Sequence, residues 1–180
     1  VDWDNTKNIY VEGDNLEVLK LLQRSYMGKV KMIYIDPPYN TGNDFVYHDD
    51  FAHTAAEEDF EAGNVDELGY RFRKNTDTNG KFHSDWCSMI YTRLLVARSL
   101  LAEDGVIFIS IDDNEVRNLR NICDEVFGEH NFVAQLVWER AYSPKNDAKY
   151  ISNSHDYILM FAKQIEDFTI VKSSICLSNI

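Results

Sequence analysis

Residues 29–42 read K-V-K-M-I-Y-I-D-P-P-Y-N-T-G, and this stretch decides how the chain folds. Val30–Ile35 is a short and mostly apolar run, which predicts a strand buried in a sheet. The next four residues, 36–39, are expected to form a loop at the carboxyl end of that strand, here called the D-P-P-Y loop. Because open α/β sheets bind their ligands at the carboxyl ends of strands, we expect a ligand site in this loop.

The residue types of the D-P-P-Y loop suit a flat ring that carries an exocyclic amine, such as a nucleobase. Such a nitrogen is a poor nucleophile because its lone pair is delocalised into the ring. Asp36 and the Pro37 carbonyl could each accept one N–H, which would localise the lone pair for in-line attack on a methyl donor. Pro37 and Pro38 fix φ and keep the acceptors rigid, and Tyr39 could stack on the base. A Pro-Pro turn is the alternative interpretation, and the buried strand before it and the N-T-G after it disfavour a turn alone.

This stretch resembles the catalytic motif of the amino-methyltransferases that modify adenine N6 in DNA. Segments similar to the same family cover nearly the whole chain, at 12–22, 82–115, 127–140 and 154–163. Together they resemble the modification subunit of type III restriction–modification systems, of the permuted β class. The resemblance implies S-adenosyl-L-methionine as the cofactor and double-stranded DNA with a flipped adenine as the substrate. It also implies a dimer of modification subunits and a restriction (helicase–nuclease) subunit as partners.

The motif, the resemblance and the position of neighbouring residues together give three groups of candidate site residues: catalytic (Asp36, Pro37, Pro38, Tyr39), cofactor-binding (Asp14, Asn15, Asp36) and substrate-binding (Tyr39, Asn40, Thr41). Asp14, with Glu17 three residues later, is equally well explained as the N-cap of a helix. Turn chemistry explains Asn40 and Thr41 nearly as well as ligand binding does. The histidines show no metal-ligand spacing, and no metal is expected for the transfer.

Composition sets limits on the class of protein. A chain of 180 residues with 44% hydrophobic residues is one domain or part of one. We expect no membrane span and no signal peptide, because no apolar run reaches about 18 residues and the first residues are acidic and polar. Three cysteines without a pairing pattern fit a reducing cytoplasm. The three cysteines are widely spaced and favour neither a zinc site nor a disulfide framework. A net charge of −12 argues against this segment as the main DNA-binding surface.

Hydrophobic spacing predicts an alternation of helices and strands. The helices are expected over 15–26, 85–101 and 112–127, and the strands over 8–12, 30–35, 106–111, 132–138 and 157–162. A long, flexible insertion is expected at about 43–82; it includes the acidic stretch 49–67 and a short helix near 55–62.

Several single residues have structural interpretations. Ser84 is a plausible N-cap, His83 a hinge and Trp86 a core residue of the helix that follows. Asp112 or Asp113 is expected to form a capping box with Glu115. Trp138 and Tyr157 are expected in the core of the sheet.

The fold class predicted from this alternation is α/β, a three-layer sandwich. The resemblance makes it a Rossmann-like methyltransferase fold with strand order 3-2-1-4-5-7-6, of which this chain supplies strands 3 to 7. Strands 1 and 2 and an F-x-G-x-G-type loop would come later in sequence, and the eight glycines contain no G-x-G. Residues 1–180 are therefore expected to be the N-terminal part of a catalytic domain, inactive by itself.

Two alternatives stay open. One is an amino-methyltransferase acting on RNA or on cytosine N4, although cytosine-N4 enzymes usually carry Ser where Asp36 stands. The other is a non-catalytic remnant or partner chain, which the missing glycine loop and the acidic charge favour for this polypeptide alone.

Overall fold

The computed structural model describes residues 5–42, 45–47, 72–76, 78–140 and 154–170. Most of the expected insertion at about 43–82, including the helix near 55–62 and the acidic stretch, lies outside these residues. Its described part contains two short antiparallel strands that were not predicted, β2 (Phe45–Tyr47) and β3 (Phe72–Lys74).

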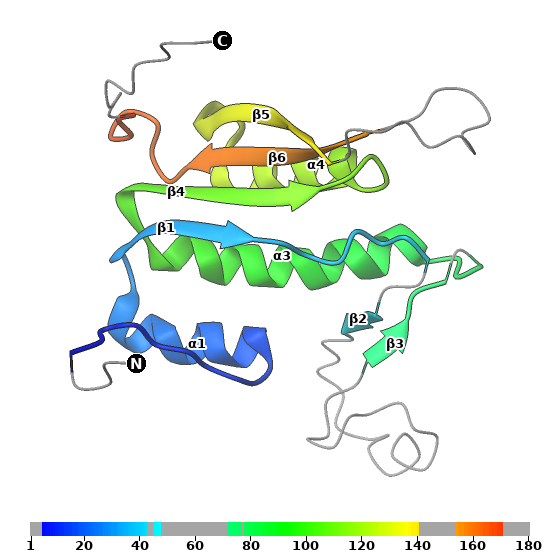
Figure 1. Cartoon of the computed structure of the whole chain (residues 1–180), viewed down its shortest axis with the longest axis horizontal. Coiled ribbons are helices and arrows are strands. Elements are labelled where there is room, and N and C mark those ends of the chain that lie inside the picture. Colours follow the sequence, from blue (N-terminus) through cyan, green and yellow to red (C-terminus); the bar gives the residue numbers. More distant parts are fainter. Residues whose placement is uncertain (1–4, 43–44, 48–71, 77, 141–153, 171–180) are drawn as a thin grey trace.

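In the described part of the chain, the main sheet has four strands in the order β1-β4-β6-β5 (Figure 1). Their bounds are β1 Val30–Ile35, β4 Leu101–Ile111, β5 Phe132–Glu139 and β6 His155–Ala162. β1 and β4 are parallel, whereas β6 runs antiparallel to both of its neighbours. This is the arrangement that the resemblance implies for strands 4-5-7-6, so the predicted α/β methyltransferase topology is confirmed for this part of the sheet.

Among the described residues, three α-helices accompany the sheet: α1 (Asn15–Tyr26), α3 (Phe82–Leu100) and α4 (Val116–Phe127). α3 and α4 pack on one face, where alternate residues of β4 and β6 point inward (Figure 1). α1 packs against α3. The other face carries exposed side chains of β1, Met32 and Tyr34. The second helical layer of the predicted sandwich is therefore not among the described helices.

The prediction of a strand over 8–12 is wrong. The structure has no strand there, and the apolar side chains of this stretch are exposed, with Tyr10 87% accessible. A strand needs a neighbour that takes up its backbone hydrogen bonds. In the implied order that neighbour is strand 2, which is not among the described strands.

The start of α1 agrees with the prediction, whereas the starts of α3 and α4 do not. α1 has its predicted bounds, and the Asp14 carboxylate accepts the Glu17 backbone N–H at 3.0 Å as a side-chain cap. α3 begins at Phe82, and Ser84 is not its N-cap because its hydroxyl donates to the Lys81 carbonyl instead.

The prediction of a capping box between Glu115 and Asp112 or Asp113 is also wrong. The Asp112 carboxylate accepts the Asn114 backbone N–H rather than that of Glu115. The Glu115 side chain turns into the interior and is fully buried. The predicted end of α4 at Gly128, with φ 93°, is confirmed.

A bulge joins α3 to the sheet. Val30 pairs with Leu101, but Met32 pairs with Val106, so β4 bulges out between these two pairs. Gly105 lies in this bulge, where a Cβ would come within 2.8 Å of the Ala102 carbonyl oxygen and 3.0 Å of the Val30 carbonyl oxygen. The close approach of three backbone segments requires glycine here.

Across the described ranges no helix is long and apolar enough to cross a membrane.

Gly105→Ala is expected to lower the free energy of unfolding by about 1–3 kcal/mol, because the added methyl group must displace backbone carbonyls. Denaturant unfolding followed by circular dichroism measures the change. Gly80→Ala is the matched control, since a Cβ at Gly80 meets nothing within 4 Å. Equal stabilities of the two variants would contradict the close approach at Gly105.

Candidate active site

The D-P-P-Y loop leaves the sheet where β1 and β4 both reach their carboxyl ends. Pro37 is buried, Pro38 and Tyr39 are half-buried, and Asp36 is exposed. The indole Nε1–H of Trp86, on α3, donates a hydrogen bond of 2.7 Å to the Pro38 carbonyl. Trp86 is fully buried in the core, as predicted, but its bond to the loop was not foreseen. The loop is thereby tied to the longest helix of the described residues.

Within the loop, the Tyr39 hydroxyl donates to Asp36 Oδ1 at 3.1 Å. Burial of the phenol, together with this hydrogen bond to the Asp36 carboxylate, raises the pKa of Tyr39 to about 12. The phenol therefore keeps its proton near neutral pH and remains a donor. One consequence is that the Asp36 carboxylate is oriented by its own loop.

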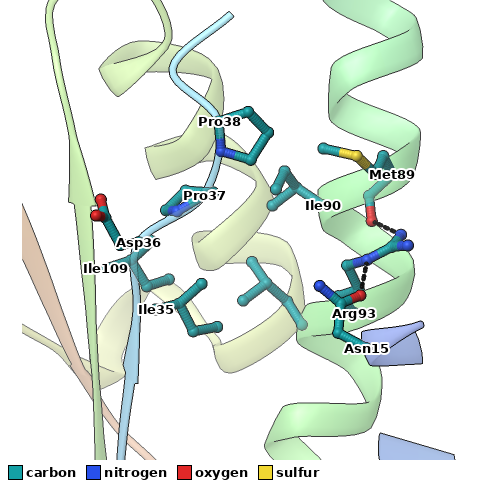
Figure 2. A pocket seen from close by; sticks show the side chains of 10 residues that line it. Asn15, Ile35, Asp36, Pro37, Pro38, Met89, Ile90, Arg93 and Ile109 are labelled. Carbon is teal, nitrogen blue, oxygen red and sulfur yellow. Dashed lines mark hydrogen bonds between the residues drawn. The ribbon is translucent and has the colours of Figure 1, made fainter. Parts of the chain in front are cut away.

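Two cavities flank the loop, one on each side of the sheet. The smaller, of about 120 Å³, lies between the loop, the start of α1 and α3 (Figure 2). Its lining is mostly apolar, and its polar groups include Asn15 and Arg93. The Arg93 guanidinium donates from Nε to Asn15 Oδ1 at 2.7 Å and from Nη1 to the Met89 carbonyl at 2.9 Å. Figure 2 shows the Asp36 carboxylate turned away from α3, as strand alternation requires after Ile35.

The larger cavity, of about 390 Å³, lies on the other side of the loop and falls within the usual size range of small-molecule sites. Residues of all four strands and the loop line it: Tyr34, Asp36, Tyr39, Ser110, Trp138, Asp156, Tyr157 and Ile158. Trp138 is 63% exposed, so its prediction as a core residue is wrong. The reason is that β5 is an edge strand whose cavity side carries no covering helix among the described residues.

The polar groups of this larger cavity are held in place by their neighbours. The hydroxyls of Tyr34 and Ser110 hydrogen-bond to each other. The Asp156 carboxylate, which is largely buried, accepts from Arg140 Nη1 at 3.1 Å. Aromatic faces and fixed polar groups around one hollow suit a flat, hydrogen-bonding ring.

The structure brings some of the predicted site residues together and separates others. Asn15 and Asp36 line the smaller cavity, while Asp36 and Tyr39 line the larger one. Asp14 caps α1, and its Oδ2 lies 3.8 Å from Arg93 Nη2, so its observed contacts are structural. Thr41 is exposed.

Asn40 does not share a cavity with its predicted neighbours. It is 1% exposed, and its amide points inward to Glu115, where Nδ2 donates to Oε1 at 2.6 Å. Sequence reasoning predicted a loop residue facing substrate, because nothing local indicates the distant carboxylate.

Six residues around the larger cavity were not predicted as site residues: Tyr34, Ser110, Trp138, Asp156, Tyr157 and Ile158. A signal was present for two of them. Ser110 interrupts the apolar run of β4, and Asp156 stands at the start of an apolar strand. Burying a polar side chain in a strand costs free energy unless the side chain has a hydrogen-bond partner. A polar residue at such a position is therefore a candidate for a functional role.

Comparisons with known proteins identify the family of the chain. The chain matches the DNA methylase family over residues 30–178, and it belongs to that family. It is 48% identical over 163 residues to the Mod subunit of the type III restriction-modification enzyme EcoP15I of Escherichia coli, covering 90% of this chain and 25% of that protein. It is 49% identical over 160 residues to the EcoPI Mod subunit of Escherichia phage P1, covering 88% of this chain and 25% of that protein. The predicted resemblance is thus confirmed, and the chain spans about a quarter of these relatives' length.

A solved structure supports the fold. The chain superposes on PvuII DNA methyltransferase (cytosine-N4-specific) with a TM-score of 0.50 and 15% identity, over 85% of this chain and 48% of that chain. At this identity the likeness shows a shared fold and nothing about the base that is modified.

Tyr39→Phe tests the bond between Tyr39 and Asp36. The wild-type chain gains stability from the neutral, hydrogen-bonded phenol at pH values below 10, the ordinary pKa of tyrosine. Between pH 10 and about 12 the unfolded phenol ionises while the folded one does not, so this contribution is lost as pH rises. The stability difference between wild type and Tyr39→Phe is therefore expected to be largest below pH 10 and to shrink above it.

Thermal unfolding on both sides of pH 10 measures this difference. Tyr10→Phe, at an exposed position, is the control and is expected to change stability little at any pH. A gap between wild type and Tyr39→Phe that stays constant through pH 10 to 12 would show that the phenol is not held in this way.

Proposed function

We propose that this chain is the amine-binding part of a site-specific DNA methyltransferase, which transfers a methyl group from S-adenosyl-L-methionine to adenine N6. One observation carries the proposal. In a chain of the DNA methylase family, the Asp36 carboxylate is oriented by Tyr39 and opens on a cavity of about 390 Å³ that is walled by aromatic rings. This is the environment that an exocyclic amine on a flat base requires.

The contacts of the loop suggest how the amine is held. Asp36 Oδ1 already accepts from Tyr39, so Oδ2 would accept one N–H of the target amine. The Pro38 carbonyl is occupied by Trp86, so the Pro37 carbonyl would accept the other N–H. Both acceptors are fixed before the base arrives. Most of the rate enhancement would therefore come from the orientation of the amine and from dipoles that are already in place. After transfer the nitrogen would lose one proton to Asp36.

The methyl donor would lie on the side of the loop that faces α1, where Asn15 would hold it and Asp36 borders the same cavity. Bound S-adenosyl-L-methionine supplies a methyl group on a sulfonium, whose carbon–sulfur bond breaks, leaving the electron pair on sulfur, as the nitrogen–carbon bond forms. A cavity of about 120 Å³ is smaller than a whole-ligand site of about 300 Å³, so the described residues enclose only one end of the donor.

The larger cavity would receive the base after it has been flipped out of the duplex. Trp138 and Tyr39 offer ring faces for stacking, which is sequence-tolerant and stabilises an extruded base. With a net charge of −12, this segment would leave most phosphate contacts to other parts of the protein. By analogy with the Mod subunits that it matches, we infer a modification-subunit dimer that works with a restriction subunit.

Asp36→Asn is expected to lower methyl transfer by the intact protein at least about 100-fold, because the amide replaces one acceptor oxygen with a donor. Folding should be preserved, since Asp36 is exposed. Methyl incorporation from labelled donor into duplex DNA gives the rate, and mass spectrometry of the nucleosides identifies the base.

Asp104→Asn is the control, an exposed aspartate that pairs with Lys31 at the opposite end of β1. It should transfer methyl groups at the wild-type rate. Wild-type turnover by Asp36→Asn would remove Asp36 from the mechanism, and N4-methylcytosine as product would replace adenine with cytosine as the target.

A further inference from the structure

A fully buried carboxylate lies behind the D-P-P-Y loop. Glu115, just before α4, is 0% exposed. Its Oε1 accepts from Asn40 Nδ2 at 2.6 Å and from His83 Nδ1 at 2.6 Å, and its Oε2 accepts from Asn118 Nδ2 at 2.7 Å. A buried carboxylate is costly unless donors surround it, and here the donors come from the loop, α3 and α4. Glu115 therefore joins three segments that are far apart in sequence.

Asn40 is the partner that connects Glu115 to the D-P-P-Y loop. It follows Tyr39 directly and has a left-handed backbone, with φ 58°. Asparagine tolerates this conformation better than other residues with a side chain, apart from aspartate. The Asn40 amide is fixed at both ends, because Nδ2 donates to Glu115 and Oδ1 accepts from Asn75 Nδ2 at 2.8 Å. Its orientation sets the direction in which the chain leaves the loop.

We propose that Glu115 is a positioning residue for methyl transfer, which acts through Asn40 to hold the D-P-P-Y loop in its reactive geometry. The loop is then held at two points, Pro38 by Trp86 and Asn40 by Glu115. Tyr39 lies between these points, and its bond to Asp36 depends on both. The effect on catalysis rests on the proposed function, whereas the effect on loop position does not.

A new negative charge at position 40 tests the hydrogen bond between Asn40 and Glu115. Asn40→Asp places a second carboxylate where a donor now lies 2.6 Å from Glu115, which should push the loop outward. The kcat of the intact protein is expected to fall about 100-fold, the cost of misplacing reacting groups by about 1 Å. The KM for S-adenosyl-L-methionine should change little. The indole N–H resonance of Trp86 should shift, because its acceptor Pro38 moves.

The double variant Asn40→Asp/Glu115→Gln should reverse both effects. The new amide at position 115 can donate to the new carboxylate at position 40, while its oxygen accepts from Asn118. His83 can accept from the same amide in its other tautomer. We expect kcat to recover at least about tenfold over Asn40→Asp, as coupled pairs do in double-mutant cycles, and the Trp86 resonance to return.

Two further variants keep the test decisive. Asn121→Asp makes the same substitution at an exposed position of α4 and should match wild type in every readout. Asn40→Gly permits the left-handed backbone but removes the amide, so it should fold with a lowered kcat and a shifted Trp86 resonance even where Asn40→Asp does not fold.

The inference is overturned by wild-type kcat and an unmoved Trp86 resonance in Asn40→Gly. It is also overturned by a folded double variant that is as impaired as Asn40→Asp. If the wild-type protein transfers no methyl group at all, the proposed function fails, and the Trp86 resonance alone decides whether Glu115 positions the loop.

Discussion

The hydrogen bond from the Trp86 indole to the Pro38 carbonyl is the interaction on which the site depends. Pro37 and Pro38 have no backbone N–H, so the loop offers the core only acceptors through these residues. A donor must therefore come from the core, and a fully buried tryptophan on α3 supplies it. Two prolines give rigidity within the loop, and this bond fixes where the rigid loop sits. Without it, Asp36 would be well oriented relative to Tyr39 but not relative to the sheet.

The sheet then decides what the loop faces. β1 and β4 run parallel, so their carboxyl ends meet at one edge, and the loop leaves β1 at that edge. Strand alternation points Ile35 toward α3 and turns the Asp36 carboxylate to the opposite side. The carboxylate therefore faces the cavity between the loop, β5 and β6, while Asp36 as a residue also borders the cavity beside α1. In the proposed function, Asp36 lies between the methyl donor and the base, and transfer between two bound molecules requires such an arrangement.

Local patterns allowed several features to be predicted from sequence. The bounds of α1 and β1 followed from the hydrophobic period and a side-chain cap, and the D-P-P-Y loop followed from its prolines. The strand at 8–12 was not correct, because a strand exists only when a neighbour completes its hydrogen bonds. Glu115 looked like a capping residue, since the partners that bury it, Asn40 and His83, are distant in sequence. Trp138 looked like core, because sequence does not tell which face of an edge strand is covered.

The most direct test of this account is a crystal structure of the intact protein with bound S-adenosyl-L-methionine. The account predicts that the donor contacts Asn15 and Asp36 on the side of the loop that faces α1, and leaves the cavity between Tyr39 and Trp138 open for the base. The Trp86 bond to Pro38 should be unchanged. A donor that fills the cavity between Tyr39 and Trp138, or that lies away from Asp36, would contradict the division of the site into a donor side and a base side.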